Sequence, residues 1–460
     1  MPAWLTRCLL RDMAKGQPED VDIAERMDGL PVPTLHLLGA ALCMAGFAFD
    51  LFELSLGSAL AAVLSAPERA VGTVTLAWLL ASVYVGAVVG APALGYMADR
   101  FGRRRMLSGG LAWLAATSTW AAFSADLLEL TVARMLSGIA VGAYPPLMMS
   151  CLTNLLPAAR RGPLMLRAPG VSALALSAGI FFVRALGSGE ILGLAGWQVA
   201  LLLGAIGSGV LSLLILRLPE SPRWLHANGR WSEAQAVYER FARSRALLPA
   251  LHARESPPSD SSRTPRDVSA SGPASVWWWI VPLFLVGPVA TVAFPMLLGA
   301  VLTLRGFNLS DALLLVGLLY LGPTLATITA SAVIDRVERR WALIGCALLM
   351  VLAGGVFVAS ESRVWLGAAA VTCGVSAVVY VTALNLYATE LLPARSRVGS
   401  FSLTWSFNRL GAAISVLALL PLLQTRGHLT MFTCITGSLV LSAVVLLTSP
   451  RGLARRPVAD

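Results

Sequence analysis

Long apolar stretches recur along the whole chain, and about twelve of them are long enough to cross a lipid bilayer as a helix. A hydrocarbon core about 30 Å thick requires roughly 20 apolar residues per helical crossing. Of the residues, 57% are hydrophobic and only 13% are charged, a balance that excludes an ordinary water-soluble domain. Alternating strands would not give stretches so uniformly apolar, which excludes a closed barrel. The sequence therefore predicts an all-α membrane protein with twelve transmembrane helices.

Positive charge gathers in alternate segments between the apolar stretches, and the net charge is +10. Lys and Arg concentrate in cytoplasmic loops, so we expect both termini and the long central segment in the cytoplasm of a multi-pass protein of the cell inner (plasma) membrane. The first residues are polar and mixed in charge, which predicts no removable signal peptide. The basic segments include 100–105, 217–266, 336–340 and 451–456.

The cysteines and histidines show no spacing typical of metal ligands. Six cysteines are scattered, mostly within apolar stretches, and we expect them to behave as small buried hydrophobic residues. The four histidines fall at helix ends or in loops, which argues against a histidine proton relay. We therefore expect no metal and no cofactor. We also expect no nucleic-acid partner, because the basic residues are accounted for by the loops.

The chain divides into two similar halves, because two motifs return at the same offset of 236 residues. Parallel six-helix repeats are a transporter architecture, in which a site between two bundles can open to either side. The expected parts are a cytoplasmic N-terminal segment (1–33), a six-helix bundle (34–217), a cytoplasmic linker (218–275), a second six-helix bundle (276–448) and a cytoplasmic tail (449–460). The repeated motifs are Asp99, Arg100, Arg103 and Arg104, which return as Asp335, Arg336, Arg339 and Arg340, and Asn154-Leu-Leu-Pro157, which returns as Glu390-Leu-Leu-Pro393.

The loop after the second apolar stretch reads GYMADRFGRRR, residues 95–105. Gly95 allows close helix approach, Asp99 can pair with arginine at a helix end, and Gly102 permits a tight turn. Arg103 and Arg104 then hold the loop at the membrane surface. An alternative interpretation is that these charges only set the topology.

This loop resembles the signature of the major facilitator superfamily, and the resemblance covers nearly all of the chain. Further matching segments are RMLSGIAVGAYPP (134–146), LPAARRG (156–162), GWQ (196–198), LPESPRWL (218–225) and ATELLPARSR (388–397). The resemblance implies two pseudo-symmetric six-helix bundles and a cytoplasmic charge network that holds the outward-facing state closed on the inside. The residues it assigns to this cytoplasmic gate are Gly95, Asp99, Arg100, Gly102, Arg103, Arg104, Arg161, Glu220, Arg223, Asp335, Arg336, Arg339, Glu390 and Arg397.

The chain departs from the family pattern at three places. Asn154 stands where an acidic residue is usual, while its counterpart Glu390 keeps the acid. Ser331 and Glu338 replace the two glycines of the second loop copy. We therefore expect an asymmetric inner gate, with one carboxylate fewer in the first half.

Two acids lie inside the first apolar stretch. Asp50 and Glu53 are three residues apart, so they share one helical face, and an uncompensated acid in hydrocarbon is costly unless it takes up a proton. Their context, AFDLFEL, resembles the paired-acid first helix of aromatic-acid and organic-acid proton symporters of the superfamily. We expect Asp50 and Glu53 to be proton-coupling residues; the alternative is that helix partners satisfy both and neither titrates.

Three arginines lie in apolar stretches. Arg134 begins the fourth stretch, and a buried guanidinium can pair with a substrate carboxylate or with an acid of the first helix. We predict that it binds substrate, with a structural ion pair to Asp50 or Glu53 as the alternative. Arg409 has Asn408 beside it, and we assign it to substrate binding; the alternatives are a gating role between the halves and a structural role. Arg184 is expected to reach the outer interface.

Polar residues elsewhere could complete a central cavity. We assign Tyr144, Tyr320 and Asn385 to the substrate-binding set on their position within apolar stretches. Tyr380 and Tyr387 are further possibilities.

The expected function is secondary active transport: proton-coupled uptake of a small organic anion, an aromatic or carboxylic acid, by a monomer in the bilayer. The sequence contains no cluster that would support an enzyme. A sugar or other neutral metabolite symporter is the first alternative, although the seventh stretch lacks the paired glutamines and asparagine of sugar porters. A drug/proton antiporter and a transporter-like sensor are the others.

Overall fold

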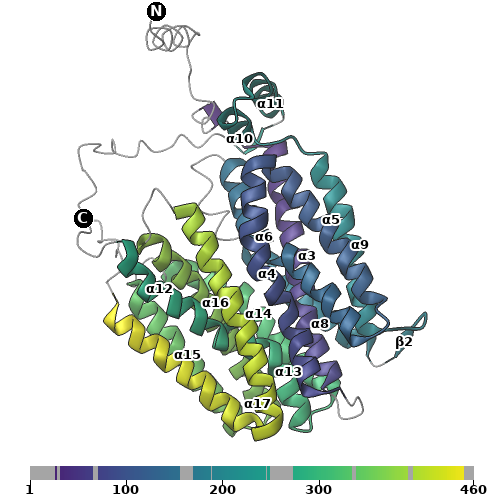
Figure 1. Ribbon diagram of the computed structural model, residues 1–460, viewed down its shortest axis with the longest axis vertical. Helices are drawn as coiled ribbons and strands as arrows, with labels where there is room; N and C mark the ends of the chain where they lie inside the picture. Colours follow the sequence, from purple (N-terminus) through teal and green to yellow (C-terminus); the bar gives the residue numbers. More distant parts are fainter. Residues whose placement is uncertain are drawn as a thin grey trace, which may run out of the picture.

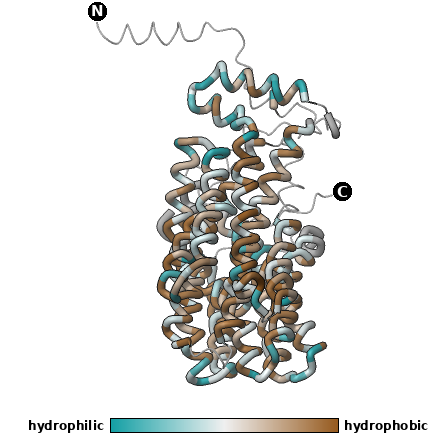
Figure 2. The backbone as a smooth tube through the Cα atoms, turned by 90° about the vertical axis from the view of Figure 1, so that its right-hand side faces the viewer, coloured by the Kyte–Doolittle hydropathy of each residue, from teal (hydrophilic) through white to brown (hydrophobic). Residues whose placement is uncertain are grey.

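Long helices packed side by side form almost the whole computed structural model (Figure 1). The structure describes residues 26–27, 32–65, 71–155, 169–187, 189–244, 246–248, 273–333, 338–391 and 397–449. Two short helices, α10 (Pro222–Ala227) and α11 (Trp231–Arg243), lie beyond one end of the bundle (Figure 1). Apolar residues run along the long helices, and the segment beyond that end carries more hydrophilic residues (Figure 2). We call that end of the bundle the linker end.

The first half contains six spanning helices, as the apolar stretches predicted. Gly102 separates the second spanning helix from the third, because its φ of 100° is a backbone conformation that glycine adopts and few other residues do. The spans are α3 (Thr34–Leu64), α4 (Thr73–Phe101), α5 (Arg103–Ala122), α6 (Leu127–Leu155), α8 (Leu174–Leu186) and α9 (Gly196–Leu216).

The second half repeats this pattern with two irregularities that the sequence did not predict. Its first span is interrupted by a π-helical turn, and its last two spans are continuous except at Gly427, where the backbone is not helical. The elements are α12 (Pro273–Pro288), η1 (Val289–Ala293), α13 (Phe294–Leu304), α14 (Leu309–Val333), α15 (Arg339–Ala359), α16 (Arg363–Leu391) and α17 (Arg397–Thr448).

Ten helical segments of the described residues are long and apolar enough to cross a membrane. The more polar α5, and the division of α17 at Gly427, bring the number of spans to the twelve expected. Large apolar side chains such as Trp78, Val89 and Leu128 remain exposed on the outside of the bundle, as lipid-facing residues do. The chain is a multi-pass membrane protein.

The 236-residue repeat extends to the packing of helix backbones. In the first half, a Cβ added to Gly138 of α6 would collide with the carbonyl oxygen of Val83 on α4. In the second half, a Cβ added to Gly374 of α16 would collide with the carbonyl oxygen of Leu319 on α14. Both residues of the second contact follow their counterparts by 236 positions, so the two halves use the same small-residue helix contact.

The linker begins with the two short helices α10 (Pro222–Ala227) and α11 (Trp231–Arg243). Arg230 donates two hydrogen bonds to Glu233 at the start of α11, and these bonds hold the pKa of the Glu233 carboxyl below its ordinary value. Two small antiparallel pairings, absent from the sequence prediction, join β1 (Val32–Pro33) to β4 (Ala246–Leu248) and β2 (Glu190–Ile191) to β3 (Leu194–Ala195).

The most extensive contacts between the halves are those of α4 with α17, α8 with α14, and α3 with α13; α3 also contacts α14, and α6 contacts α17. Thr73 at the start of α4 donates a hydrogen bond to Gln424 of α17. Arg184, which was expected to reach the outer interface, is partly exposed and donates from Nε to the carbonyl oxygen of Ser310 at 3.0 Å. Both contacts lie at the end opposite the linker end.

Candidate functional site

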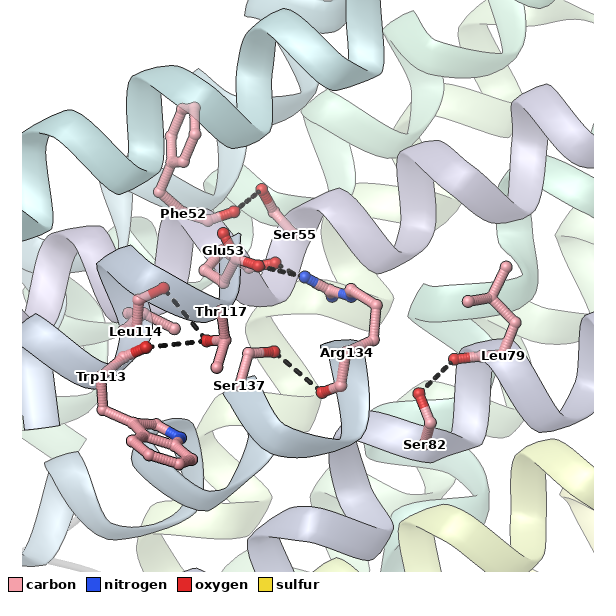
Figure 3. A network of polar contacts seen from close by, with 10 residues as sticks. All are labelled: Phe52, Glu53, Ser55, Leu79, Ser82, Trp113, Leu114, Thr117, Arg134 and Ser137. Carbon is pink, nitrogen blue, oxygen red and sulfur yellow. Dashed lines mark hydrogen bonds and ion pairs between the residues drawn. The ribbon is translucent and has the colours of Figure 1, made fainter. Parts of the chain in front are cut away.

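A buried ion pair joins α3 to α6 (Figure 3). Arg134 Nη1 donates to Glu53 Oε1, and the two side chains are only 2% and 1% exposed. Arg134 Nη2 also lies 3.4 Å from the carbonyl oxygen of Glu53, and Ser137 Oγ donates to the carbonyl oxygen of Arg134 at 2.8 Å. Of the two acids named as structural partners for Arg134, the structure pairs it with Glu53, while its assignment to substrate binding stays a prediction.

The second oxygen of Glu53 faces the interior of the first half. Glu53 Oε2 has no hydrogen-bond partner within the described part of the chain, and a Cβ added to Gly204 of α9 would lie 3.3 Å from it. The buried hydroxyl of Ser118 on α5 interacts with the Glu53 carboxylate, and the buried hydroxyl of Ser208 on α9 has no hydrogen-bond partner in the described residues. Glu53 is thus held among helices of one half.

Asp50, one turn earlier on α3, has different surroundings. Its side chain is 1% exposed, and Oδ1 makes no hydrogen bond to any described residue. It interacts electrostatically with Arg409 of α17, in the other half, and with Glu53. The two acids share a helical face as expected, but Asp50 is the one that senses a charge across the interface between the halves.

Arg409 is a buried cation set among aromatic rings. Its side chain is 7% exposed, with the guanidinium carbon 4.8 Å from the centre of the Trp405 ring and 6.0 Å from that of Tyr84. Its Nε has no hydrogen-bond partner among the described residues. The neighbouring Asn408 is also buried. An aromatic surround stabilises the cation through ring faces and leaves guanidinium N–H groups available for an anion.

Tyr84 of α4 was not a sequence candidate, although the repeat contained the signal. Tyr84 and Tyr320 are separated by 236 residues, the offset of the repeat, and they occupy equivalent positions in α4 and α14. The two tyrosines interact electrostatically in the structure. Tyr320 OH forms a 2.6 Å hydrogen bond with Ser58 Oγ of α3 and so links the two halves.

Tyr144, another predicted cavity residue, interacts electrostatically with Asp50, while Asn385 makes no contact with these residues that the structure describes. Tyr144 is buried inside the first half, where its OH donates to the carbonyl oxygen of Cys43 at 3.5 Å and its ring stacks on Phe47. Asn385 is half-buried on α16, and its Oδ1 has no partner among the described residues.

The predicted cytoplasmic gate residues of the first half gather at the linker end. Asp99 and Arg103 form an ion pair of 3.8 Å. Glu220 accepts a hydrogen bond from the backbone N–H of Arg104 at 3.3 Å, and a Cβ added to Gly102 would lie 2.5 Å from Glu220 Oε2. The loop after α4 is therefore fastened to the segment that follows α9.

LPESPRWL supplies further contacts at the same place. Trp224 Nε1 donates to the carbonyl oxygen of Asp99 at 3.0 Å, and Arg223 Nη1 donates to that of Thr153 at 3.3 Å. Gly95 lies on α4, and the Arg100 guanidinium lies 5.7 Å from the centre of the Phe101 ring.

The gate residues of the second half are described only in part. Arg339 begins α15, and next to it Arg340 and Glu338 form a 3.9 Å ion pair. Arg161, Asp335 and Arg336 lie outside the described residues, as do the side chains of Asn154, Ser331, Glu390 and Arg397. The expected asymmetry of the gate stays a prediction.

Comparison with known families decides the identity of the fold. The model of the Major Facilitator Superfamily matches residues 38–416. The chain belongs to the major facilitator superfamily. It is a multi-pass membrane transporter of that superfamily, and its fold is the one that the loop motif implied.

Several superfamily members resemble the chain at 23% to 33% identity. The chain is 23% identical over 438 residues to the putative metabolite transport protein YyaJ of Bacillus subtilis, covering 92% of this chain and 94% of that one. It is 33% identical over 166 residues to the arabinose-proton symporter of Bacillus subtilis, covering 35% of this chain and 36% of the symporter. It is 24% identical over 223 residues to the niacin transporter NiaP of Acinetobacter baylyi, covering 48% of this chain and 49% of NiaP. The last two matches span only about a third and about half of those relatives.

Solved structures agree on the fold. The xylose transporter XylE from E. coli, in a partially occluded inward-open conformation, superimposes with a TM-score of 0.68 at 16% sequence identity, covering 91% of this chain and 98% of XylE. At that identity the likeness extends to the superfamily fold, and the site must be argued from its own residues.

Proposed function

We propose that this protein is a proton-coupled transporter that takes up a small organic anion, an aromatic or aliphatic carboxylate, by alternating access. Arg409 carries the proposal. A buried guanidinium between the halves, bordered by Trp405 and Tyr84 and with an unpartnered Nε, offers both charge and ring faces to an aromatic carboxylate. A neutral sugar would leave that charge uncompensated whenever Asp50 carries a proton, which is costly in a low-dielectric interior.

Asp50 gives the coupling to protons in this proposal. While Asp50 is ionised, its charge partly compensates Arg409 across the interface. A proton on Asp50 removes that compensation, so Arg409 attracts the substrate carboxylate more strongly. Proton and anion then favour each other's binding, which is the thermodynamic requirement for symport.

Glu53 and Arg134 have a different part in the proposed mechanism. Arg134 is neutralised by Glu53 within the first half, so we propose that this pair positions α3, which carries Asp50, and that Glu53 exchanges protons with Asp50 one turn away. The hydrogen bond between Tyr320 and Ser58 joins the halves beside the proposed substrate position. In this proposal Tyr144 and Asn385 contact the substrate only after the helices rearrange. The linker-end charges would close the cavity on the cytoplasmic side in the other state.

A sugar symporter is the second candidate, because relatives named for arabinose and xylose match this chain. The niacin transporter favours the anion instead, since niacin is an aromatic carboxylate. The competing candidates make different demands on Arg409. An anion needs its charge, whereas a sugar needs only hydrogen-bond donors and acceptors.

The test is proton movement in proteoliposomes with a pH-sensitive dye, challenged with aromatic acids, aliphatic carboxylates, sugars and cationic drugs. Alkalinisation outside upon addition of a carboxylate, lost in Asp50→Asn, is the expected result. Proton movement with sugars alone would establish the second candidate and reject the first. The cellular assignment, an inner membrane with both termini cytoplasmic, is tested separately by labelling cysteines introduced near each terminus with an impermeant maleimide in intact cells.

A further inference from the structure

Two cysteines from different helices meet near the linker end of the first half. Cys43 of α3 and Cys151 of α6 are 108 residues apart in sequence, yet the Cys43 thiol donates a hydrogen bond to the Cys151 sulfur at 3.5 Å. Both are free thiols. Cys43 is buried and Cys151 is half-buried, so only the second offers a reagent direct access.

The surroundings favour reactivity at Cys151. Both cysteines line a pocket at the linker end, together with Arg103, Arg104 and Glu220. Cys151 accepts the Cys43 thiol hydrogen, and its sulfur lies within electrostatic range of the Arg103 guanidinium. A thiolate is the form that attacks oxidants.

We propose that Cys43 and Cys151 form a reversible oxidation site that closes to an intramolecular disulfide between α3 and α6. With hydrogen peroxide as the oxidant, the Cys151 thiolate attacks one peroxide oxygen, becomes a sulfenic acid and releases hydroxide. The Cys43 sulfur then attacks the Cys151 sulfur; the S–S bond forms, the S–O bond breaks and the oxygen leaves as water. The two thiols lose two electrons and the peroxide gains two. The sulfur atoms need to approach by about 1.5 Å, because a disulfide bond is about 2.05 Å long.

The bond would constrain the helix that carries the buried acids. Cys43 precedes Asp50 by seven residues on α3, and Cys151 follows Tyr144 by seven on α6, so both cysteines lie about two turns nearer the linker end. Tyr144 already contacts the backbone of Cys43. A disulfide would join α3 to α6 between the linker-end pocket and Asp50.

The experiment treats the purified full-length protein in detergent with hydrogen peroxide, then denatures it and counts free thiols with a maleimide of high mass. Two of the six thiols should become unreactive, with recovery after dithiothreitol. Mass spectrometry of the digest should identify a Cys43–Cys151 linked peptide about 2 Da lighter than the two reduced peptides together. In Cys43→Ser, Cys151 should instead give a sulfenic-acid adduct with dimedone.

Cys346 and Cys373, both buried in the second half, provide the matched control. The variant Cys346→Ser/Cys373→Ser keeps the proposed pair and should lose two thiols on oxidation as the wild type does. Retention of all six thiols, linkage of other cysteines, or a disulfide between two molecules on a non-reducing gel would each reject the proposal. Because this control variant leaves α3 and α6 unchanged, poor folding of the Cys43 or Cys151 variants would not prevent the test.

Discussion

Arg134 pairs with Glu53 and not with Asp50, although both acids lie on the same face of α3. The choice leaves Asp50 as the acid that interacts with Arg409 of the opposite half. A chain with two adjacent carboxylates thus gives them separate environments: one is neutralised within a bundle, and the other responds to a charge across the interface.

Breaking the Glu53–Arg134 pair should destabilise the first half. Glu53→Gln leaves a guanidinium buried at 2% exposure without its counter-charge, which costs about 3–5 kcal/mol. Thermal unfolding in detergent, followed by tryptophan fluorescence, should show a lower midpoint. The double variant Glu53→Gln/Arg134→Gln should lose less than the two single variants together, because no lone charge remains. Wild-type melting of both single variants would contradict a stabilising pair.

Asp50→Asn should separate transport from proton coupling. The amide cannot carry the proton, so accumulation driven by a pH gradient should be abolished while exchange of labelled for unlabelled substrate persists. Wild-type uptake should fall as external pH rises, and the variant should lose this dependence. The measurement is substrate accumulation in proteoliposomes with the pH gradient imposed in either direction. Accumulation by the variant at the wild-type level would remove Asp50 from the coupling role.

Arg409→Lys should weaken recognition of a carboxylate while preserving charge. Lysine cannot reproduce the planar pair of donors, and loss of a charge-assisted hydrogen bond of about 1.5–3 kcal/mol would raise the apparent KM by about 10- to 100-fold. Initial uptake rates against substrate concentration test this. Lys15, in the N-terminal segment that precedes the first span, offers a control in Lys15→Arg, for which unchanged kinetics are expected. An unaltered KM in Arg409→Lys would eliminate the proposed anion contact.

The repeated helix contact should respond alike in both halves. Gly138→Ala and Gly374→Ala each place a methyl group against a backbone carbonyl oxygen, and overpacking of this kind costs about 1–3 kcal/mol. Both should melt at lower temperature than wild type. Gly355→Ala on α15, where an added Cβ meets nothing within 4 Å, is the control and should melt as wild type does. If all three variants melted at the same temperature, the tight backbone contact at Gly138 and Gly374 would be refuted.

Gly102 should tolerate no side chain. Its φ of 100° is strained for other residues, at about 1–3 kcal/mol, and the added Cβ would also press on Glu220. Gly102→Ala should therefore lower the yield of folded protein, measured as the monodisperse fraction by size-exclusion chromatography. Gly109→Ala on α5 is the control: an added Cβ there meets nothing within 4 Å, so the yield of folded protein should not change.

The sequence predicted most of the fold because membrane solvation acts on local composition: each span must be apolar and must satisfy its own backbone. The repeat motifs at offset 236 then gave the two halves. The partner of Arg134 could not be predicted, because Asp50 and Glu53 share a helical face and the choice depends on the rotation of α3 against α6. Tyr84 was missed for a different reason: a single aromatic residue carries no signal until its counterpart Tyr320 is placed beside it. The π-helical turn at Val289–Ala293 also depends on packing that no local pattern encodes.

The glycine contacts at Gly138 and Gly374 carry a mechanical consequence. Where backbones touch directly, no layer of side chains can slide or change rotamer, so α4 with α6, and α14 with α16, behave as paired struts. Each half has such a strut at the equivalent place, and the strut helices α4 and α14 carry Tyr84 and Tyr320 to the interface. We therefore expect Tyr84 and Tyr320 to move as rigid parts of their bundles when one half tilts against the other.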